Sequence, residues 1–311
     1  MTAVLGLDTS NYTTSAAVYR SDGTGLNAGK LLEVPEGALG LRQSDALYQH
    51  VRRLPGRIAE LRKAGVLKNL AAVGASTAPR AVEGSYMPCF LAGESQARVL
   101  SDTLGVPFFS CSHQQGHVAA ACWSAGRPEL LDQSFLTWHL SGGTTELLLA
   151  RPVDDMPQMT ILGATEDISA GQLIDRTGRM LDLAFPCGKA LDALATQSDS
   201  HDAFPVKLRG LNFSLSGVEN QVKQRIERGT NPADVARFTL NTVSDLVYRV
   251  TEAARQAYPA LPVLCSGGVA SNSLLRKTME GALFAEPQYS TDNAMGVAIL
   301  TYRALERGYL G

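Results

Sequence analysis

The sequence lacks an apolar run long enough to cross a membrane, and it lacks a basic segment at its start. No stretch of about 18 consecutive apolar residues occurs in the chain, and no cationic region precedes the apolar residues 1–5. We therefore expect a cytoplasmic protein without a signal peptide or a membrane partner. With 45% hydrophobic and 19% charged residues, the 311-residue chain can bury one large core or two medium ones.

Paired cysteines are also absent. The five cysteines show no CxxC spacing, so the sequence predicts neither a disulfide framework nor a thiolate zinc site. We expect most of them to behave as small buried hydrophobic residues. They are Cys89, Cys111, Cys122, Cys187 and Cys265.

The chain has little excess charge of either sign. A net charge of −2 and a pI near 6.2 argue against a surface that attracts nucleic acid as a whole. An RNA contact would need a local basic patch, and the best candidate is the segment HVRRLPGRIAELRK at residues 50–63. A solvated helix face explains the same basic residues and is the simpler interpretation.

Strand and helix patterns alternate through the first 125 residues, which predicts a sheet covered by helices. The same order starts again after residue 133. In the first half we expect a hairpin over 3–20, helices over 44–64, 89–105 and 113–126, and strands over 71–77 and 106–111. In the second half we expect a hairpin over 134–150, helices over 168–184, 232–257, 271–283 and 293–308, and a strand over 261–268.

The two halves predict a duplicated α/β fold with a cleft between them. The triplets 141–143 and 266–268 are both Ser-Gly-Gly and both end an apolar strand, which is a weak sign of an internal repeat. We expect one subdomain over 1–125, completed by the last helix within 293–311, and a second over 126–292.

Two histidines stand four residues apart in the segment SHQQGH. His113 and His117 lie on one face of a predicted helix and can point at one metal ion. Gly116 between them has no side chain, which lets another element approach the helix closely. A zinc protease would carry HExxH, whose glutamate activates water. Gln114 occupies that position here and cannot act as a base.

Further ligands must come from elsewhere in the chain. His139 ends an apolar strand and Asp292 precedes the last predicted helix. A strand-edge histidine and a helix N-cap are the alternative interpretations of these two residues. Imidazoles plus one carboxylate suit Zn²⁺ or Fe²⁺ and leave a coordination position open for a substrate oxygen.

Three turns follow predicted strands, namely DTSNYTT, LSGGTTE and CSGGVASN. The sequence has neither GxxxxGK[ST] nor GxGxxG, which argues against a P-loop and a dinucleotide-binding fold. Glycine turns still present backbone N–H groups to phosphate oxygens. Three turns that each follow a strand, two of them with paired glycines, favour a nucleotide or phosphate site.

The ordered motifs LGLDTS, SHxxGH, LSGGTTE, GATEDISAGQLIDR, FPCGKALDALA, LNFSLSG, SGGVASN and STDNA cover nearly the whole chain. In this order the sequence resembles the tRNA threonylcarbamoyladenosine transferase family, formerly called O-sialoglycoprotein endopeptidases. The resemblance implies the actin-like ATPase (ASKHA) fold, with two duplicated ribonuclease-H-like halves and an interdomain cleft.

The resemblance also implies site residues. It assigns an iron or zinc ion to His113, His117 and Asp292, with His139 at a position where some members have a ligating tyrosine. In the first turn it makes Asp8, Ser10 and Thr13 the candidate catalytic residues. The contacts implied for ATP, AMP or threonylcarbamoyl-adenylate are Ser141, Gly142, Gly143, Asp175, Gly188 and Asn272.

The chemistry implied by the family is transfer of threonylcarbamoyl from its adenylate to N6 of tRNA adenosine 37, with AMP leaving. The expected partners are tRNA, other proteins of the threonylcarbamoyladenosine pathway, an actin-like paralogue or a second copy of the chain.

The sequence departs from the family pattern on the acceptor side. Tyr12 and Thr13 replace an acidic pair, Arg80 and Glu83 are new charges in the loop TAPRAVEGSYMP at residues 77–88, and Ile168 and Gln172 alter the DDAAGEAFDK motif. Three interpretations therefore stay open. They are a metal-dependent acyltransferase acting on tRNA, a paralogue that acts on another acceptor or as a non-catalytic subunit, and a hydrolase, against which Gln114 argues.

Overall fold

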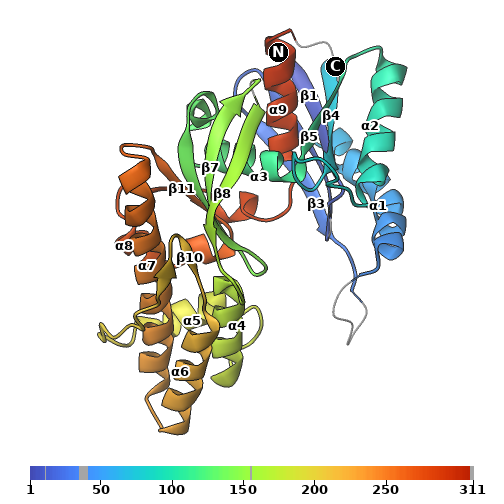
Figure 1. Ribbon diagram of the computed structural model, residues 1–311. Coiled ribbons are helices and arrows are strands. Elements are labelled where there is room, and N and C mark those ends of the chain that lie inside the picture. Colours follow the sequence, from blue (N-terminus) through green and yellow to red (C-terminus); the bar gives the residue numbers. More distant parts are fainter. Residues whose placement is uncertain (11, 35–40, 155, 309–311) are drawn as a thin grey trace. The chain divides into compact units, whose positions relative to one another are not determined.

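The computed structural model describes residues 1–10, 12–34, 41–154 and 156–308. The chain divides into two compact units (Figure 1). The first unit consists of Met1–Asp132, Pro152–Gln158 and Thr291–Gly311, and the second of Gln133–Arg151 and Met159–Ser290. The C-terminal helix thus belongs to the first unit.

The first unit contains a five-stranded sheet in the order β3-β2-β1-β4-β5. The expected hairpin is present, because β1 and β2 pair antiparallel, and β4 and β5 continue the sheet in parallel. The third strand was not predicted, because its glycines, asparagine and lysine form no apolar alternation and only Ala28 is buried. The strands are β1 (Ala3–Asp8), β2 (Thr13–Arg20), β3 (Gly25–Leu31), β4 (Leu70–Ala78) and β5 (Phe108–Ser112).

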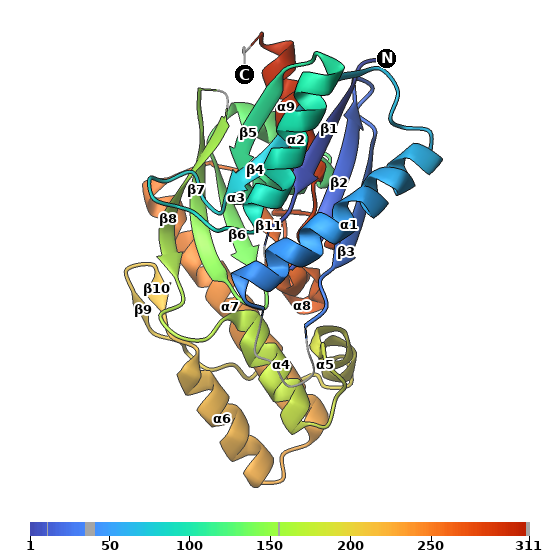
Figure 2. The same ribbon diagram turned by 90° about the vertical axis from the view of Figure 1, so that its right-hand side faces the viewer.

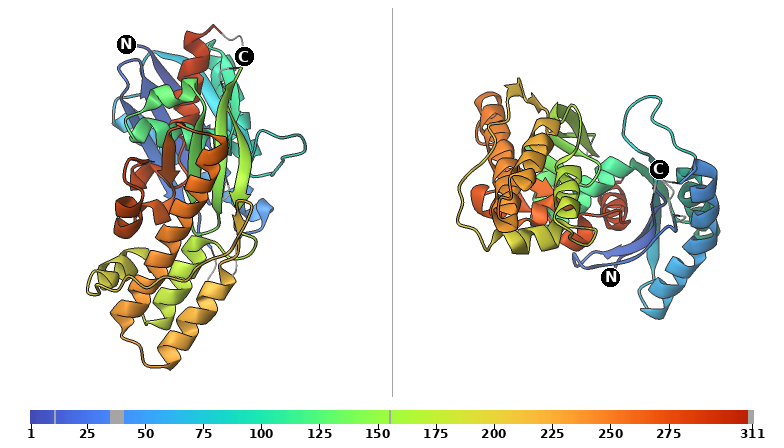
Figure 3. Two further views of the ribbon diagram at one scale, coloured as in Figure 1. Left: turned by 60° about the vertical axis from the view of Figure 1, so that its left-hand side comes forward. Right: turned by 90° about the horizontal axis from the view of Figure 1, so that it is seen from below.

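Helices cover both faces of this sheet, as the alternating pattern predicts. On one face α1 (Gln43–Lys63) packs on β2 and α2 (Phe90–Leu104) packs on β4 (Figure 2). On the other face α9 (Met295–Glu306) packs on β1, β2 and β4 and contacts α3 (His113–Ser124) (Figure 3). A short 3-10 helix, η1 (Pro128–Asp132), follows α3.

Glycines allow α9 to approach its neighbours closely. A Cβ atom at Gly6 would lie 2.5 Å from Ala298 N, and one at Gly296 would lie 1.7 Å from Gly116 O. Neither space admits a side chain. The expected close approach at Gly116 is therefore confirmed, and the approaching element is α9.

The second unit repeats the strand order of the first. Its sheet runs β8-β7-β6-β11-β12, with β6 and β7 antiparallel and β11 parallel to both β6 and β12. The predicted duplication is therefore confirmed. The strands are β6 (Phe135–Leu140), β7 (Thr145–Val153), β8 (Met156–Ala164), β11 (Val263–Ser266) and β12 (Leu283–Phe284).

The helices of the second unit partly differ from expectation. Those expected over 168–184 and 271–283 are shorter, and the helices at Gly188–Ala195 and Ser216–Glu227 were not predicted. The second of the shortened helices ends before Gly281, whose φ of +87° suits a turn. The helices are α4 (Ala170–Met180), α5 (Gly188–Ala195), α6 (Ser216–Glu227), α7 (Pro232–Ala257), α8 (Ser273–Thr278), η2 (Gly268–Ser271) and η3 (Pro287–Tyr289), and a small hairpin is made by β9 (Leu208–Arg209) and β10 (Asn212–Phe213).

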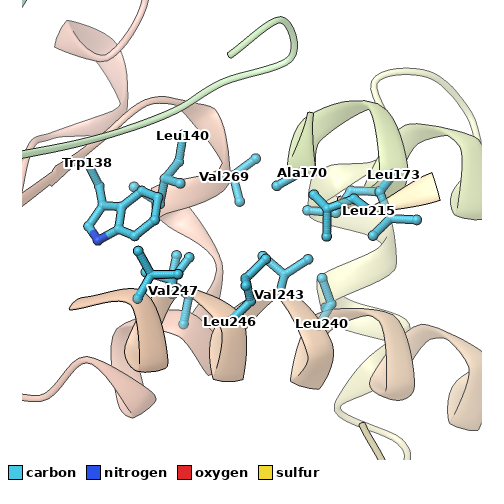
Figure 4. Packing of buried hydrophobic residues seen from close by; sticks show 14 of the residues in the cluster. Trp138, Leu140, Ala170, Leu173, Leu215, Leu240, Val243, Leu246, Val247 and Val269 are labelled. Carbon is cyan, nitrogen blue, oxygen red and sulfur yellow. The ribbon is translucent and has the colours of Figure 1, made fainter. Parts of the chain in front are cut away.

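The core of the second unit is built around α7. Its apolar face packs under Trp138 and Leu140 of β6 and against α4, as Figure 4 shows. The indole N–H of Trp138 donates to Thr251 Oγ1 of α7 at 2.8 Å, so this buried polar atom is satisfied.

All five cysteines are buried and unbridged, as expected. Within the described part of the chain, no helix has both the length and the apolar character needed to cross a bilayer.

Candidate functional site

The first turn of α3 is fixed by a capping box. The Ser112 hydroxyl accepts the N–H of Gln115, and the Gln115 side chain accepts the N–H of Ser112. The N–H of Gln114 donates to Pro79 O at 3.1 Å and ties this turn to the loop after β4. The helix therefore begins at His113, and His117 follows one turn later on the same face.

The two histidines meet Asp292, which lies just before α9. The Nε2 atoms of His113 and His117 are 3.4 and 3.2 Å from Asp292 Oδ1, and the two ring centroids are 4.3 Å apart. One ligand atom from each residue lies within 4.8 Å of the others, and among the described residues this is the one such group of three. The predicted convergence of these residues is therefore present within the first unit.

The donor set and its spacing fit a divalent transition metal. Two ligand atoms bound at about 2.1 Å to a tetrahedral ion lie about 3.4 Å apart, which matches the distances to Asp292 Oδ1. Two imidazoles and one carboxylate also leave one position open.

A helix-capping role was the alternative interpretation of Asp292. The structure gives that role to a neighbour, because Asn293 Oδ1 accepts the N–H of Met295 at 3.0 Å. No side chain caps the helix at its N-cap residue, Ala294. The Asp292 carboxylate is instead directed at the histidines.

Asp8 supports this cluster from the end of β1. It is 1% exposed, and its Oδ2 accepts the Nδ1–H of His113 at 2.7 Å. Its Oδ1 accepts the N–H of Ser10, also at 2.7 Å. The structure therefore links Asp8 directly to a candidate metal ligand.

The charges of the cluster reinforce one another. Burial acts to raise the pKa of Asp8, but the charge and hydrogen bond of His113 outweigh it and lower that pKa. Burial acts to lower the pKa of His113, but Asp8 and Asp292 raise it to about 10. Burial likewise acts to raise the pKa of Asp292, and hydrogen bonds from both histidines bring it far below its usual range. The two ionised carboxylates therefore hold the metal-free His113 in its cationic form, and a bound metal ion would take the place of the proton on Nε2.

The other two candidate catalytic residues follow Asp8 in the β1–β2 turn. Ser10 is 1% exposed, and within the described part of the chain its Oγ has no hydrogen-bond partner. The N–H of Thr13 donates to Ser10 O at 3.2 Å and closes the turn. Both residues are therefore buried beside Asp8.

His50 is a buried histidine of α1 that the sequence motifs do not single out. It is 0% exposed on α1, and its Nδ1 is hydrogen bonded to Thr14 Oγ1 at 2.8 Å. Burial lowers its pKa to about 4, against the opposing charges of Asp8 and Asp292. The signal was its place on the buried stripe of α1 with Ala46 and Leu54, at helical spacing.

The second unit holds a cavity of about 590 Å³. Four of the six predicted nucleotide contacts line it, namely Gly142, Asp175, Gly188 and Asn272. Ser141 and Gly143 are not among the lining residues. The Ser141 hydroxyl instead accepts the N–H groups of Gly143 and Thr144, which shapes the turn after β6.

Hydrogen bonds fix the walls of this cavity. Asp175 Oδ1 accepts the N–H of Cys187 at 2.9 Å, which holds the start of α5 against α4. Asn272 donates to Asp192 Oδ1 at 2.8 Å and accepts the N–H of Leu275 at 2.9 Å. The Asn272 amide thus joins α5 to α8 and caps α8.

The glycine turns after β6 and β11 lie at the same edge of the sheet, because the two strands are parallel neighbours. A Cβ atom at Gly171 would lie 2.5 Å from Ser141 O, and one at Gly267 would lie 2.1 Å from Leu140 O. These glycines let α4 and the second turn pack directly on the first. The two Ser-Gly-Gly triplets repeated in the sequence therefore form a pair of adjacent turns.

His139, the fourth predicted metal ligand, lies on β6 in the second unit. It is opposite Glu146 in the sheet register, with Nδ1 3.9 Å from the Glu146 carboxylate. The group of three ligands in the first unit does not include it. A ligand role for His139 stays a prediction.

The basic segment on α1 takes part in ion pairs. Arg53 lies 2.6 Å from Glu33, and Arg57 lies 2.9 Å from Glu60. These pairs favour the interpretation as a solvated helix face. A role in RNA binding stays a prediction.

Solved structures of low identity define the class of fold. Full-length HypF in its phosphate- and nucleotide-bound form matches with a TM-score of 0.64 at 12% identity, over 97% of this chain and 47% of that one. Component A of the (R)-2-hydroxyglutaryl-CoA dehydratase of Acidaminococcus fermentans matches with a TM-score of 0.58 at 16% identity, over 98% and 100%. The protein therefore has the actin-like ATPase fold, with two duplicated units, as the resemblance implied.

The sequence comparisons identify the family. Residues 40–299 match the family described as tRNA N6-adenosine threonylcarbamoyltransferase. A relative of that name from Thermus thermophilus is 31% identical over 98% of this chain and 94% of its own length. The chain belongs to the tRNA N6-adenosine threonylcarbamoyltransferase family.

Proposed function

We propose that the protein is a metal-dependent acyltransferase that moves threonylcarbamoyl from its adenylate to N6 of tRNA adenosine 37. The observation that carries this proposal is the convergence of His113, His117 and Asp292 in a chain of this family. Two imidazoles and one carboxylate would leave one coordination position of a bound ion open for a substrate oxygen.

His113, His117 and Asp292 would hold an iron or zinc ion. When bound, such an ion polarises a carbonyl or holds a phosphate oxygen. Each of the three residues presents its ligand atom from a fixed backbone, because α3 is capped at Ser112 and packs against α9. The chain therefore presents these atoms with little conformational freedom left to lose.

The cavity of the second unit would hold the adenylate. Gly142 brings backbone close to the ligand without a Cβ atom, and Asp175 offers a carboxylate to a ribose hydroxyl. In the reaction, the bond from N6 to the carbamoyl carbon forms and the bond from that carbon to the AMP phosphate oxygen breaks. The amine proton is lost and AMP departs. Positioning of amine and carbonyl would supply most of the acceleration.

The β1–β2 turn favours a second candidate function. Residues 9–13 contain no carboxylate, since Tyr12 and Thr13 stand where the family has acidic residues. Asp8 engages both of its oxygens in hydrogen bonds. These observations support a paralogue that binds nucleotide and metal but acts on another acceptor or as a non-catalytic subunit. A hydrolase is disfavoured because Gln114 replaces the required glutamate.

Incubation of the purified protein with threonylcarbamoyl-adenylate and unmodified tRNA tests the proposal. Nucleoside mass spectrometry should detect the modified adenosine, and a His113→Ala variant should yield none. Saturable AMP binding without any product would favour the second candidate. Adding extracts fractionated for pathway proteins, an actin-like paralogue or further copies of the chain would test the proposed partners.

A further inference from the structure

We infer that Asp8 is a positioning residue, which holds His113 in the orientation and tautomer needed to bind the metal, and that it is not the base that accepts the proton of the acceptor amine. This inference rests on the metal-binding part of the proposed function. It changes the role that the sequence suggested for Asp8.

A general base must reach the proton that it removes. Asp8 is 1% exposed, so its carboxylate has almost no surface that an acceptor can touch. Both of its oxygens already accept hydrogen bonds of 2.7 Å, one from Ser10 N and one from His113 Nδ1. Asp8 is therefore placed to hold the His113 ring and not to contact the acceptor amine.

The backbone of Asp8 is also fixed. Asp8 is the last residue of β1 and is paired with Ser15 of β2. Backbone pairing on both sides of β1, with β2 and with β4, holds the strand in place. The carboxylate consequently meets the imidazole from a rigid strand end, which is what an orienting residue requires.

The bond to Asp8 determines which nitrogen of His113 can bind a metal. A carboxylate that accepts the Nδ1–H keeps the proton on Nδ1 and leaves the Nε2 lone pair for the ion. Nε2 is the atom directed at Asp292 Oδ1, 3.4 Å away. Asp8, His113 and the ion site thus form the carboxylate–histidine–metal arrangement in which the outer carboxylate strengthens the ligand.

Zinc affinity of the full-length protein, measured by competition with a chromogenic chelator, tests the inference without any tRNA. Asp8→Asn removes the negative charge but keeps the shape, and should weaken zinc binding about 10–100-fold. Asp8→Glu keeps a carboxylate and should recover part of the affinity. Ser15→Ala is the matched control, because it removes only the 3.2 Å bond from the Ser15 hydroxyl to Asp8 O and leaves the strand pairing and the Asp8 carboxylate in place, and it should bind zinc as the wild type does.

Histidine-selective ¹⁵N NMR of the zinc form supplies the second readout. His113 should be protonated on Nδ1 and bound through Nε2 in the wild type, and this signature should be lost or mixed in Asp8→Asn. Wild-type affinity and an unchanged tautomer in Asp8→Asn would overturn the inference, as would an equal loss of affinity in Ser15→Ala.

The two proposals fail in different ways. A wild type that binds no divalent metal would overturn both. A wild type that binds zinc and loses it in Asp8→Asn, yet transfers no threonylcarbamoyl to tRNA, would support the role of Asp8 and contradict only the proposed reaction.

Discussion

His50 is a buried imidazole whose surroundings favour its neutral form. Burial lowers its pKa from the usual 6.5 to about 4. Above pH 6.5 both the folded and the unfolded chain are neutral at this site. Between pH 6.5 and 4 the unfolded chain takes up a proton and the folded chain does not, so stability falls as the pH falls, by about 2 kcal/mol at pH 5.

Urea unfolding at pH 7 and pH 5 measures this loss. A His50→Gln variant should be less stable than the wild type at pH 7, because the buried bond to Thr14 is altered, but should lose less stability between the two pH values. His201→Gln, which changes an exposed histidine, should keep the wild-type pH dependence. The same pH-dependent loss in all three proteins would contradict the assignment to His50.

Removal of one metal ligand should release the ion. In His113→Ala only one imidazole and one carboxylate of the cluster remain, and two ligands seldom hold a divalent metal tightly. Elemental analysis after dialysis should find less than a tenth of the wild-type metal content, by analogy with the 10–100-fold losses seen for weaker perturbations. His139→Ala is the informative comparison, since metal loss there would support its predicted ligand role and full occupancy would contradict it.

At the scale of single residues, the spacing of the two histidines predicted part of the candidate metal site. The helical period alone places His113 and His117 on one face. Asp292 was only a candidate ligand from its place before the last helix, and the family resemblance assigned it to the same ion, because no local pattern links residues that are 175 positions apart. The bond from Asp8 to His113 spans 105 positions and needed the sheet and α3 to be in place. The family resemblance implied that Asp8 is a catalytic residue, and its burial could not be predicted from the motif.

At the scale of secondary-structure elements, the contact between α3 and α9 positions the three candidate metal ligands. Gly296 →Ala would place a Cβ atom 1.7 Å from Gly116 O and force the two helices apart. We expect a stability loss of about 1–3 kcal/mol from overpacking, together with weaker zinc binding, because α3 carries both histidines and Asp292 precedes α9. Thermal unfolding and chelator competition measure the two effects.

Two other glycines provide controls for this prediction. A Cβ atom at Gly116 would lie 3.4 Å from its nearest neighbour, so Gly116→Ala should have a milder effect. Gly56, inside α1, has open space around the Cβ position, and Gly56→Ala should stabilise the protein by up to about 1 kcal/mol through helix propensity. A Gly296→Ala variant as stable as Gly56→Ala would show that the helices separate without cost.

Elements with a strong apolar period were predicted well, and those defined by their partners were not. Residues 232–257 match α7 at both ends, because a Pro at its first position and an Asn cap mark the start. The strand at Gly25–Leu31 has no such period and exists through its pairing with β2. The helix at Gly188–Ala195 is only eight residues long, too short for a clear amphipathic pattern.

At the scale of the whole molecule, the duplication was predictable, and the two copies carry different candidate binding residues. The repeated Ser-Gly-Gly triplets predicted two copies, and the two sheets have the same strand order. The candidate metal ligands belong to the first unit and the candidate nucleotide cavity to the second. Each copy therefore supplies its own residues to one part of the proposed reaction.

This division predicts that metal and nucleotide binding can be removed separately. Asp175→Ala should weaken AMP binding by about 1.5–3 kcal/mol if its carboxylate accepts a ribose hydroxyl, while zinc content stays at the wild-type level. His113→Ala should show the reverse, with AMP affinity retained, because sites without shared residues perturb each other little. Isothermal titration with AMP and elemental analysis measure both quantities on the same samples.

Because the Asp175 carboxylate also holds the backbone at the start of α5, a second variant is needed to interpret a loss of AMP binding. Asp175 accepts the N–H of Cys187, so Asp175→Ala could act by releasing the start of α5. Asp175→Asn keeps an acceptor for that N–H and removes only the charge. Weak AMP binding in both variants would support a direct contact with the ribose, whereas normal binding in Asp175→Asn would assign the loss to the backbone. Zinc loss in either variant would contradict the separation of the two sites, because neither changes a residue of the first unit.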